Sequence, residues 1–521
     1  RFIVTPGSFG LEEYLIAHYN LGYAYFKMKQ YDTAITWFRK YNSLLNDSQV
    51  NTVADAYNRI GDCFFIQRRY WAAIDYYEKA ANLDVLDADY ALFQRGFSLG
   101  LVSRPEKKIE TLKGLLNKYP TSNYTDDAIF EIAEAYNILE NTSQAIDFYK
   151  RVESEFPNSS YYPKALVQIG LLYYNSSDLE NSLAYYKRVV ENYPNSPEAK
   201  NALIGIRNIY IDKGDAATYF NYASKLGSIA NISASEKDSL SYMAAEKVYL
   251  TGNCEKSILA FEDYLSENPQ GNFAVNAMYY IADCNIRNNN VDKAVEYFEN
   301  IINRPRNSFT EQSLLRISNI YLNQKQYEKA YTYLDNLESI AEVKSMLLDA
   351  RLGKLRCAFE LQRDDQMPVI AASILSTEKL SPELERETRF KLAKANYRSK
   401  KYDDALIEFS KVAQNLKTIE GAESKYMKAL IYFERGEYNR TENEVFSFAE
   451  NNTPHQYWLA KSFILLADSY AAQNDFFQAK ATLQSVLDGY SNTTDGIIDE
   501  ATTKLNQLVK SEKERQSVKQ D

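Results

Sequence analysis

Residues 21–38 read LGYAYFKMKQYDTAITWF, in which Gly22 is followed by Ala34 after twelve positions and by Phe38 after sixteen. This order of a small, a second small and a large residue recurs along almost the whole chain. The residues at its first position are Gly22, Gly61, Gly96, Ala133, Gly170, Gly205, Ala245, Ala282, Ser318, Arg356, Ala393, Ala429 and Ala467. These thirteen positions lie on average about 37 residues apart, which identifies a tandem repeat of one supersecondary unit.

Each repeat is predicted to be a pair of antiparallel helices. In each half, apolar residues recur at positions i, i+3, i+4 and i+7, the spacing of an amphipathic helix. A short polar stretch such as 29–32 separates the halves, so the second helix folds back on the first. The second small position, where the two helices approach closely, holds Ala34, Ala73, Ala145, Ser182, Ala217, Ser257, Ala294, Ala330, Ala405, Thr441 and Ala479. Because one hairpin cannot bury its own apolar face, we expect the hairpins to stack into a continuous α-solenoid.

The repeat resembles the tetratricopeptide repeat over residues 12 to about 490. This resemblance implies an all-α fold, a right-handed superhelix of about thirteen helical hairpins. A further amphipathic stretch at 497–509 is expected to cap the last hairpin. Several repeats end in an aromatic residue or Asn followed by Pro, and two continue as Pro-Asn-Ser, at 157–159 and 194–196. Such endings are similar to those of bacterial envelope proteins of the TolA-binding type, of the lipoprotein subunit of the outer-membrane barrel assembly machine, and of large Bacteroidetes-type repeat proteins.

The lengths of the repeats predict four segments. The longest step follows Gly205, and residues 225–238 (KLGSIANISASEKD) are small and polar. We therefore expect an N-terminal array of about six repeats at 1–224, an irregular joint at 225–238, a C-terminal array of about seven repeats at 239–495, and a capping helix with a charged tail at 496–521. The tenth repeat has Arg356 at the small position and Pro368 where Ala is expected, which predicts a distorted hairpin.

Composition and charge argue against several classes of function. The 60 Lys and Arg against 70 Asp and Glu give a net charge of −10, which disfavours binding to nucleic acid or anionic lipid. No run approaches 18 uninterrupted apolar residues, so no membrane span is expected. The four cysteines have no paired spacing and do not predict a disulfide scaffold. The chain starts at Arg1 without an initiator Met or a signal pattern, which favours a mature or excised piece of a longer protein.

No catalytic site, metal site or cofactor is predicted. His18 and His455 lie in different terminal regions, and no motif brings partner residues to either of them. No phosphate-binding loop, dinucleotide fingerprint or zinc-hydrolase motif occurs. Paired acidic residues such as Asp126 and Asp127 fall at expected helix starts, where they favour the helix dipole. We therefore expect a protein that is not an enzyme.

The resemblance implies that the first helices of the hairpins line a concave groove that binds partner peptides or helices. Positions −3, −2, +1, +4 and +5, counted from the first small residue of each repeat, are expected to face this groove. The partner-binding residues expected on this basis are Tyr19, Asn20, Tyr23, Lys27, Asn58, Arg59, Asp62, Phe130, Glu131, Glu134, Asn137, Gln168, Tyr174, Asn175, Tyr279, Tyr280, Asp283, Arg287, Phe390, Lys391, Lys394 and Arg398. Tyr and Asn suit a recognition surface, but packing of the tyrosines between neighbouring helices is an equally open interpretation.

Two functions are consistent with these features. The first is a non-catalytic protein–protein interaction scaffold that organises a bacterial cell-envelope complex, with an acidic groove sector around Glu131 and Glu134 and a basic one around Lys391 and Lys394. The alternative is a structural module that self-assembles into homo-oligomers. The first hypothesis implies a periplasmic or outer-membrane-associated location, and the cytoplasm is the alternative. The identity of the partner, the oligomeric state and any further domain stay open.

Overall fold

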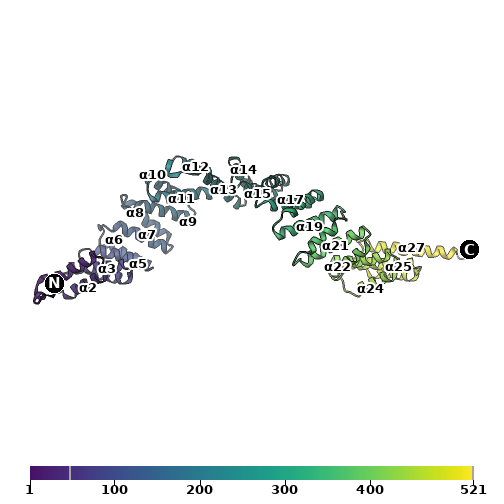
Figure 1. Ribbon diagram of the computed structural model, residues 1–521, viewed down its shortest axis with the longest axis horizontal. Coiled ribbons are helices and arrows are strands. Elements are labelled where there is room, and N and C mark those ends of the chain that lie inside the picture. Colours follow the sequence, from purple (N-terminus) through teal and green to yellow (C-terminus); the bar gives the residue numbers. More distant parts are fainter. Residues whose placement is uncertain (46–48, 519–521) are drawn as a thin grey trace. The chain divides into compact units, whose positions relative to one another are not determined.

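The computed structural model describes residues 1–45 and 49–518, and these residues form helices with no strand among them (Figure 1). Close packing divides the chain into two units, Arg1–Asn253 and Cys254–Asp521. The first unit contains the short 3-10 helices η1 (Phe2–Val4), η2 (Ser8–Gly10) and η3 (Gly227–Ala230), and the helices α1 (Glu12–Lys27), α2 (Tyr31–Leu44), α3 (Val50–Ile66), α4 (Tyr70–Asn82), α5 (Ala88–Leu101), α6 (Pro105–Lys118), α7 (Thr125–Ile138), α8 (Thr142–Glu155), α9 (Tyr162–Asn175), α10 (Leu179–Asn192), α11 (Pro197–Asp212), α12 (Ala216–Ser224) and α13 (Ala234–Leu250).

The described residues of the second unit form α-helices joined by turns, with no 3-10 helix and no strand among them. They are α14 (Cys254–Glu267), α15 (Ala274–Arg287), α16 (Val291–Ile302), α17 (Thr310–Asn323), α18 (Tyr327–Ile340), α19 (Lys344–Glu360), α20 (Met367–Leu375), α21 (Pro382–Arg398), α22 (Tyr402–Val412), α23 (Ile419–Glu434), α24 (Tyr438–Ala449), α25 (Gln456–Ala472), α26 (Phe476–Gly489) and α27 (Ile497–Val518).

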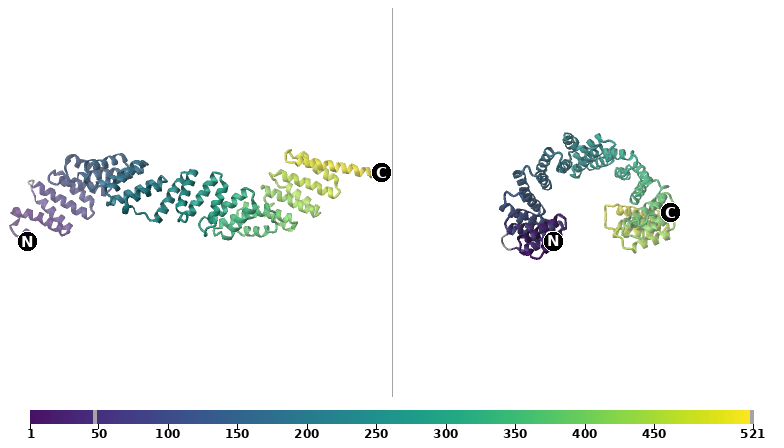
Figure 2. Two further views of the ribbon diagram at one scale, coloured as in Figure 1. Left: turned by 90° about the horizontal axis from the view of Figure 1, so that it is seen from above. Right: turned by 60° about the vertical axis from the view of Figure 1, so that its left-hand side comes forward.

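Consecutive helices pack as hairpins in each unit, as the views in Figure 2 show. In the first unit α1 to α12 form six hairpins, and α13 follows them. In the second unit α14 precedes six hairpins formed by α15 to α26, and α27 packs on α25 and α26. The order of the helices therefore matches thirteen pairs and a cap, which confirms the predicted all-α solenoid.

The first small residue of a repeat makes room for the large residue sixteen positions later. A Cβ atom placed on Gly22 would lie 2.6 Å from the ring of Phe38, and one on Gly61 would lie 2.6 Å from the ring of Tyr77. Both rings are buried, with 0 and 1 % of their residues' surface exposed. The hairpin repeats because this contact requires a small residue on the first helix and a large one on the second.

The second small position is buried in almost every repeat. The residues Ala34, Ala73, Ala145, Ser182, Ser257, Ala294, Ala330, Ala405, Thr441 and Ala479 have no exposed surface. Ala217 is the exception, because it is exposed while Tyr219 is buried. The prediction for Ala217 was therefore wrong, and the sixth repeat is shifted by two residues.

Every first helix ends in the same left-handed turn, with φ between 56 and 80°. The residues in this turn are Lys29, Arg68, Ser103, Glu140, Ser177, Gly214, Gly252, Asn289, Lys325, Gln362, Lys400, Gly436 and Asn474. After twelve of these residues the next backbone N–H bonds to a carbonyl five residues earlier, as Gln30 does to Tyr25 at 2.9 Å, which is the Schellman motif. In the other repeats the first small residue lies seven positions before the residue in this turn. The same count places the first positions of the sixth and tenth repeats at Arg207 and Leu355. The predicted positions, Gly205 and Arg356, were therefore wrong by two residues and one residue.

The tenth hairpin, which the sequence predicted to be distorted, has a short second helix. Its second helix, α20, has nine residues and begins with Met367 and Pro368. Arg356 pairs with Glu387 of α21, and the close approach at Gly353 is to the preceding hairpin, since a Cβ there would lie 2.7 Å from Leu334 of α18. An arginine is therefore tolerated at a position that does not carry the contact.

Two further predicted segments lie at the ends of the arrays. Residues 225–238 contain η3 and the first residues of α13, whereas the division between the two units falls at 253/254. A joint at 225–238 stays a prediction. In α27, Ile497 and Ala501 are buried against α25 and α26, which confirms the capping helix, and the end of the charged tail lies outside the described residues.

Candidate partner-binding face

The residues predicted to face a groove differ in burial. Asn58, Asp62 and Phe130 are buried, with 0, 7 and 9 % of their surface exposed. The amide of Asn58 lies against the next hairpin and donates to the carbonyl oxygen of Asp87 at 3.4 Å. A partner does not reach these three side chains because the packing between hairpins covers them. The exposed predicted residues are Asn20, Lys27, Asn175, Arg287 and Arg398, and the others are half-buried.

Asp55 of α3 joins the first two hairpins. The hydroxyls of Tyr19 and Tyr23 on α1 each donate to Oδ2 of Asp55 at 2.5 Å. Burial raises the pKa of Tyr23 to about 12, and the bond to Asp55 adds to this effect. Tyr19 and Tyr23, two of the tyrosines predicted to recognise a partner, therefore bond within the stack.

Asp62, also on α3, joins the second hairpin to the third. Its Oδ1 accepts hydrogen bonds from Tyr77 at 2.8 Å and from Tyr90 at 2.6 Å, and its other oxygen pairs with Arg59. Burial raises the pKa of Asp62, although Arg59 and the two hydroxyls favour the charged form. This carboxylate links α3, α4 and α5, so its conformation is set by three helices.

Tyrosine-to-carboxylate hydrogen bonds recur along both units. The pairs are Tyr149 with Glu134, Tyr174 with Asp212 at 2.5 Å, Tyr297 with Glu262 at 3.1 Å, Tyr333 with Glu299 at 2.5 Å, Tyr397 with Glu434 at 2.6 Å and Tyr470 with Glu442 at 2.6 Å. The aromatic rings pack between helices while the hydroxyls bond to half-buried or exposed acids. This pattern gives these tyrosines a packing role in the stack.

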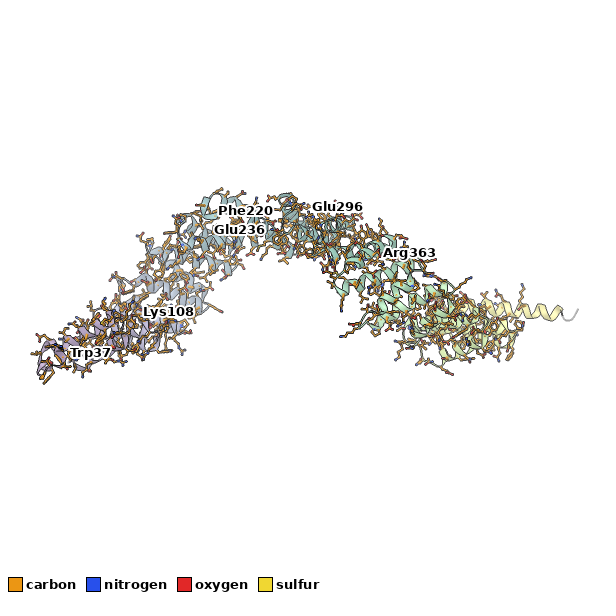
Figure 3. All side chains as sticks on the ribbon, in the orientation of Figure 1. Trp37, Lys108, Phe220, Glu236, Glu296 and Arg363 are labelled. Atoms are coloured by element: carbon orange, nitrogen blue, oxygen red, sulfur yellow. The ribbon has the colours of Figure 1, made fainter. Side chains whose placement is uncertain are left out.

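The acidic groove sector has partners within the protein. Glu131 pairs with Lys108 of α6, which is only 5 % exposed and is labelled in Figure 3. Lys108 stands at the second small position of its repeat, and Gly100 provides the space, since a Cβ there would lie 3.1 Å from Cδ of Lys108. Glu134 accepts from Tyr149. Glu131 therefore joins α6 to α7 through an ion pair, and Glu134 joins α7 to α8 through a hydroxyl, so both acids already have a partner within the protein.

The basic sector surrounds the ring of Phe359. Lys391 Nζ and the guanidinium of Arg398 each lie 4.4 Å from its centroid. Lys394 pairs with Glu423 at 2.9 Å, and Arg398 pairs with Asp364 at 2.6 Å. Burial lowers the pKa of Lys391, for which the described residues provide no carboxylate within ion-pair distance. One half-buried cation of the three is thus left without an acidic partner.

Two further predicted groups lie in the second unit. Tyr280 stacks on Phe261 with ring centroids 5.6 Å apart, and Tyr279 packs against Phe309 at 4.6 Å. The exposed Arg287 pairs with Asp283 one turn earlier at 2.7 Å. Asn20, Lys27 and Asn175 are brought together with none of these groups.

An apolar row on the first unit was missed by the sequence reasoning. Ile66, Leu101 and Ile138 are the last residues of α3, α5 and α7, and they are 49, 46 and 65 % exposed. Lys27 and Asn175 hold the same position in the flanking repeats, so polar residues bound the row on both sides. The signal was present in the sequence, because all five residues share the offset of +5 from the first small residue.

The second unit has a different composition at this position. Its first helices end in Arg287, Asn323, Glu360, Arg398, Glu434 and Ala472. In the described repeats, large apolar residues at this position therefore occur in the first unit and not in the second. Leu250, at the end of α13 in the first unit, is a further exposed example.

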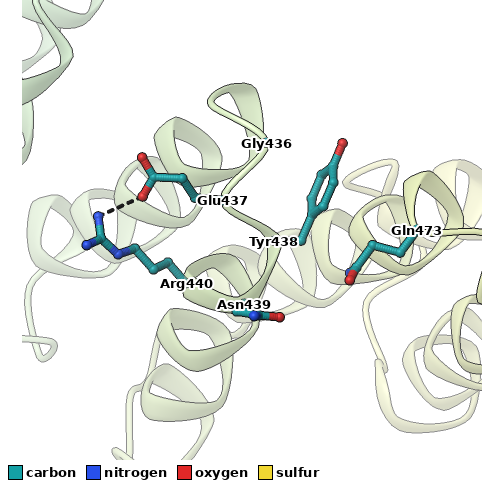
Figure 4. Close-up of a pocket in the computed structure, with 6 residues that line it drawn as sticks. All are labelled: Gly436, Glu437, Tyr438, Asn439, Arg440 and Gln473. Atoms are coloured by element: carbon teal, nitrogen blue, oxygen red, sulfur yellow. Dashed lines mark hydrogen bonds and ion pairs between the residues drawn. The ribbon is translucent and has the colours of Figure 1, made fainter.

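A surface hollow of about 500 Å³ lies at the turns of the last two hairpins (Figure 4). It is lined by Gly436, Glu437, Tyr438, Asn439, Arg440 and Gln473. Glu437 and Arg440 pair with each other across 2.7 Å. The hollow is open to solvent and holds no convergent set of unpaired charges, so it indicates no chemistry.

The described residues contain neither a metal-binding cluster nor a membrane-spanning helix. No group of three His, Cys, Asp or Glu side chains in them is placed to hold a metal ion. His18 is buried against the rings of Tyr14 and Trp37, and its Nδ1 lies 2.7 Å from the carbonyl oxygen of Tyr14. Among the same residues, no helix combines the length and apolar character needed to cross a bilayer.

Comparison with solved structures finds other repeat proteins. The peptide-binding repeat protein YrrB is 17 % identical, with a TM-score of 0.30 over 36 % of this chain and 91 % of its own. Yeast Tom70 is 15 % identical, with a TM-score of 0.25 over 81 % and 96 %. The C-terminal part of a repeat protein from Cytophaga hutchinsonii is 17 % identical, with a TM-score of 0.31 over 57 % and 99 %. All three scores lie below 0.5, so none of these likenesses carries a functional conclusion.

Comparison with protein families gives a direct assignment of the repeats. No curated protein matches the chain. Models described as tetratricopeptide repeat match residues 13–84, 127–159, 164–196, 276–307, 311–343 and 456–493. These segments fall in both units, and each begins in or next to a first helix of the observed hairpins. The chain is therefore a tetratricopeptide repeat protein, a scaffold for protein–protein interaction.

Proposed function

We propose that this scaffold is non-catalytic and holds a segment of a partner protein along the first helices of its second, third and fourth hairpins. The observation that carries the proposal is the row formed by Ile66, Leu101 and Ile138. Complete burial of such a side chain contributes about 1.5–3 kcal/mol, so covering the exposed half of each contributes roughly 1 kcal/mol. Three such side chains supply part of the free energy that a micromolar complex requires, about 8 kcal/mol.

The spacing of the row limits the form of the partner. The helices that carry the row also contact one another in order, α3 with α5 and α5 with α7. Because packed helices lie about 8–10 Å apart, we expect a similar distance between consecutive members of the row. An extended segment spans about 10 Å in three residues, and a helix spans about 10.5 Å in seven. The proposed ligand therefore carries apolar side chains at i, i+3 and i+6 if it is extended, or at i, i+7 and i+14 if it is helical.

Selection from a displayed random-peptide library tests this proposal on the whole chain. Enriched peptides are expected to carry one of the two apolar spacings. The triple variant Ile66→Ser, Leu101→Ser, Ile138→Ser should weaken their binding at least tenfold, measured by fluorescence anisotropy. The matched control is Leu86→Ser, because Leu86 is 66 % exposed in the same unit but lies off the row. Failure to enrich any peptide, or equal binding by the triple variant, contradicts the proposal.

A second candidate, homo-oligomerisation, has an observation of its own. Exposed apolar side chains gather at the start of the first unit, and they are Phe2, Val4, Phe9, Leu11 and Ile16. An exposed apolar group of this kind favours self-association. Multi-angle light scattering over a hundredfold concentration range tests it, and a constant monomer mass argues against it.

A role in a bacterial cell-envelope complex, at the periplasm or outer membrane, is proposed from the Pro-Asn-Ser repeat endings alone. Fractionation of the source cells, with antibody detection of the chain, tests this location against the cytoplasm. Recovery in the cytosolic fraction would remove the envelope role and leave the binding proposal unaffected.

A further inference from the structure

The turns beside the apolar row carry charges of opposite sign at its two ends. In the first three hairpins, the four residues that start at the end of the first helix are 27–30 (KMKQ), 66–69 (IQRR) and 101–104 (LVSR), with five cations and no acid. In the fourth and fifth hairpins, the same residues are 138–141 (ILEN) and 175–178 (NSSD), with two acids and no cation. The surroundings of the row therefore change from basic to acidic along its length.

The cations at the basic end are accessible to a ligand. Lys27, Lys29 and Arg68 are exposed, and the described residues provide no hydrogen-bond or ion-pair partner for their charged groups. Lys27 is the last residue of α1 and holds the position of the row in its hairpin. Lys29 and Arg68 occupy the left-handed turns two residues beyond that position. All three side chains therefore begin next to the row, where an acid on a bound segment lies within their reach.

Two further cations at this end have weak partners. Arg69 pairs with Asp32 at 3.6 Å, and the two side chains are 56 and 79 % exposed. An exposed pair of this kind contributes little, because water and salt screen it. The guanidinium of Arg104 lies 5.9 Å from the ring centroid of Trp71, a contact that does not neutralise its charge. The basic end therefore keeps a net positive charge.

The helix dipole does not account for the change of sign. Cations at a helix C-terminus interact favourably with the dipole, but that effect would favour cations at all five helix ends. Glu140 follows α7 in the same left-handed turn, is exposed, and has no partner among the described residues. Asp178 has a local role, because it accepts the backbone N–H of Asn181 at 3.2 Å and so caps α10. Glu140 has no such role, and its carboxylate is unfavourable at the end of α7.

The charges follow one another along the row in the order of the helices. The hydroxyls of Tyr19 and Tyr23 join α1 to Asp55 of α3. Helix α3 contacts α5, and α5 contacts α7. Helices α7 and α9 share one hydrophobic core, in which Ala133 and Ile169 are buried. The basic end of the row therefore lies at α1 and α3, and the acidic end lies at α7 and α9.

We propose that the segment held by the row is acidic at the end that lies over α1 and α3, and carries no acid at the end that lies over α7 and α9. This inference rests on the proposed function, because it assigns a charge pattern and a direction to the segment that the row is proposed to hold. Lys27, Lys29 and Arg68 attract the acidic end, and Glu140 repels it if the segment binds in the reverse direction. Because these charges are exposed, they set the direction and the rate of binding more than its strength.

The test uses the tightest peptide from the random-library selection as the parent probe. Four versions of it carry three Glu or three Lys at the N-terminus or at the C-terminus, and binding to the full chain is measured by fluorescence anisotropy. Three Glu at one terminus should strengthen binding about threefold or more, and three Glu at the other terminus should weaken it. Lys extensions should have the opposite effects. All four effects should shrink at about 1 M salt, where the Debye length is about 3 Å.

Reversal of charge in the protein should reverse the preference. In the variant Lys27→Glu, Lys29→Glu, Arg68→Glu, the Glu extension that strengthened binding should weaken it, and the Lys extension at that terminus should strengthen it. The matched control has the same change in net charge at exposed lysines of the first unit that lie away from these turns, and it should keep the wild-type preference. Its substitutions are Lys40→Glu, Lys107→Glu and Lys200→Glu.

The outcomes separate this inference from the proposed function. Tight binding of the parent peptide with equal effects of Glu and Lys at both termini would overturn the charge pattern and leave the row as a binding site. A preference that the control variant also reverses would show that net charge acts instead of the turns beside the row. Failure to enrich any peptide contradicts the proposed function and, with it, this inference.

Discussion

The hydroxyl of Tyr90 on α5 donates a hydrogen bond of 2.6 Å to Oδ1 of Asp62 on α3, the carboxylate that Tyr77 of α4 also contacts. Replacement by Tyr90→Phe should lower the free energy of unfolding of the first unit by about 1–3 kcal/mol, because it leaves a buried acid with one donor fewer. Urea denaturation followed by circular dichroism measures the change. Tyr25→Phe is the control, since the described residues provide no partner for that hydroxyl, and equal losses in the two variants would show that the bond to Asp62 is not special.

Gly61 and Gly114 should respond in opposite directions to the same substitution. Gly61→Ala places a Cβ 2.6 Å from the buried ring of Tyr77 and should destabilise by about 1–3 kcal/mol. Gly114→Ala on α6 meets no atom within 4 Å and should stabilise by about 0.5–1 kcal/mol through helix propensity. The thermal midpoints of the two variants give the signs. A neutral Gly61→Ala would contradict the close contact between glycine and ring.

The left-handed turn at the end of α17 is occupied by Lys325, at φ 57°. A side chain in this conformation costs roughly 1 kcal/mol that glycine does not, so Lys325→Gly should stabilise the second unit by up to that amount. Gln324→Gly, one residue earlier at φ −81°, should destabilise instead. No strain is relieved there, and glycine loses more backbone freedom on folding than glutamine does. Urea titration of both variants tests the pair of signs, and stabilisation by both would contradict the argument.

The ionisation of Glu387 should contribute to the pH dependence of the stability of the second unit. Both nitrogens of the Arg356 fork donate to its carboxylate at 2.8 Å, and this pairing lowers the pKa of Glu387 below its usual range. A carboxyl whose pKa is lower in the folded state adds stability above its unfolded pKa, and this stability is lost as the pH falls through the folded pKa. Glu387→Gln should therefore reduce the difference in urea midpoint between about pH 7 and pH 3.

The control for this prediction is Glu450→Gln, because the described residues provide no ion-pair partner for Glu450. It should leave the difference between the two pH values close to that of the wild type. A Glu387→Gln variant with the full wild-type difference would show that the Arg356 pair does not contribute.

The first positions of the repeats show which contacts a local sequence pattern can predict and which it cannot. The spacing from Gly61 to Tyr77 could be recognised in the sequence because the contact lies within one hairpin. The shift of the sixth repeat to Arg207 could not, since Gly205 is small and fits the pattern equally well. In the structure, a Cβ on Gly205 would lie 2.4 Å from Tyr186 of the preceding hairpin, so the glycine serves a contact outside its own repeat.

The candidate site was less predictable than the fold. Positions on the first helices could be assigned from the repeat, yet Asp62 and Phe130 proved buried and Tyr174 proved bonded to Asp212. Whether a tyrosine faces a partner or a neighbouring acid depends on a residue one repeat away, which helical periodicity does not report.

By itself, the sequence determined that the chain forms helices, that they pair, and that about thirteen pairs stack in order, because helix period and close approach at Gly22 or Gly61 act within about forty residues. The tertiary structure was needed to show which acids are paired within the protein, and that Ile66, Leu101 and Ile138 remain exposed together. The physical reason is that exposure and contact between hairpins depend on the side chains of the adjacent repeat, and no single repeat contains that information.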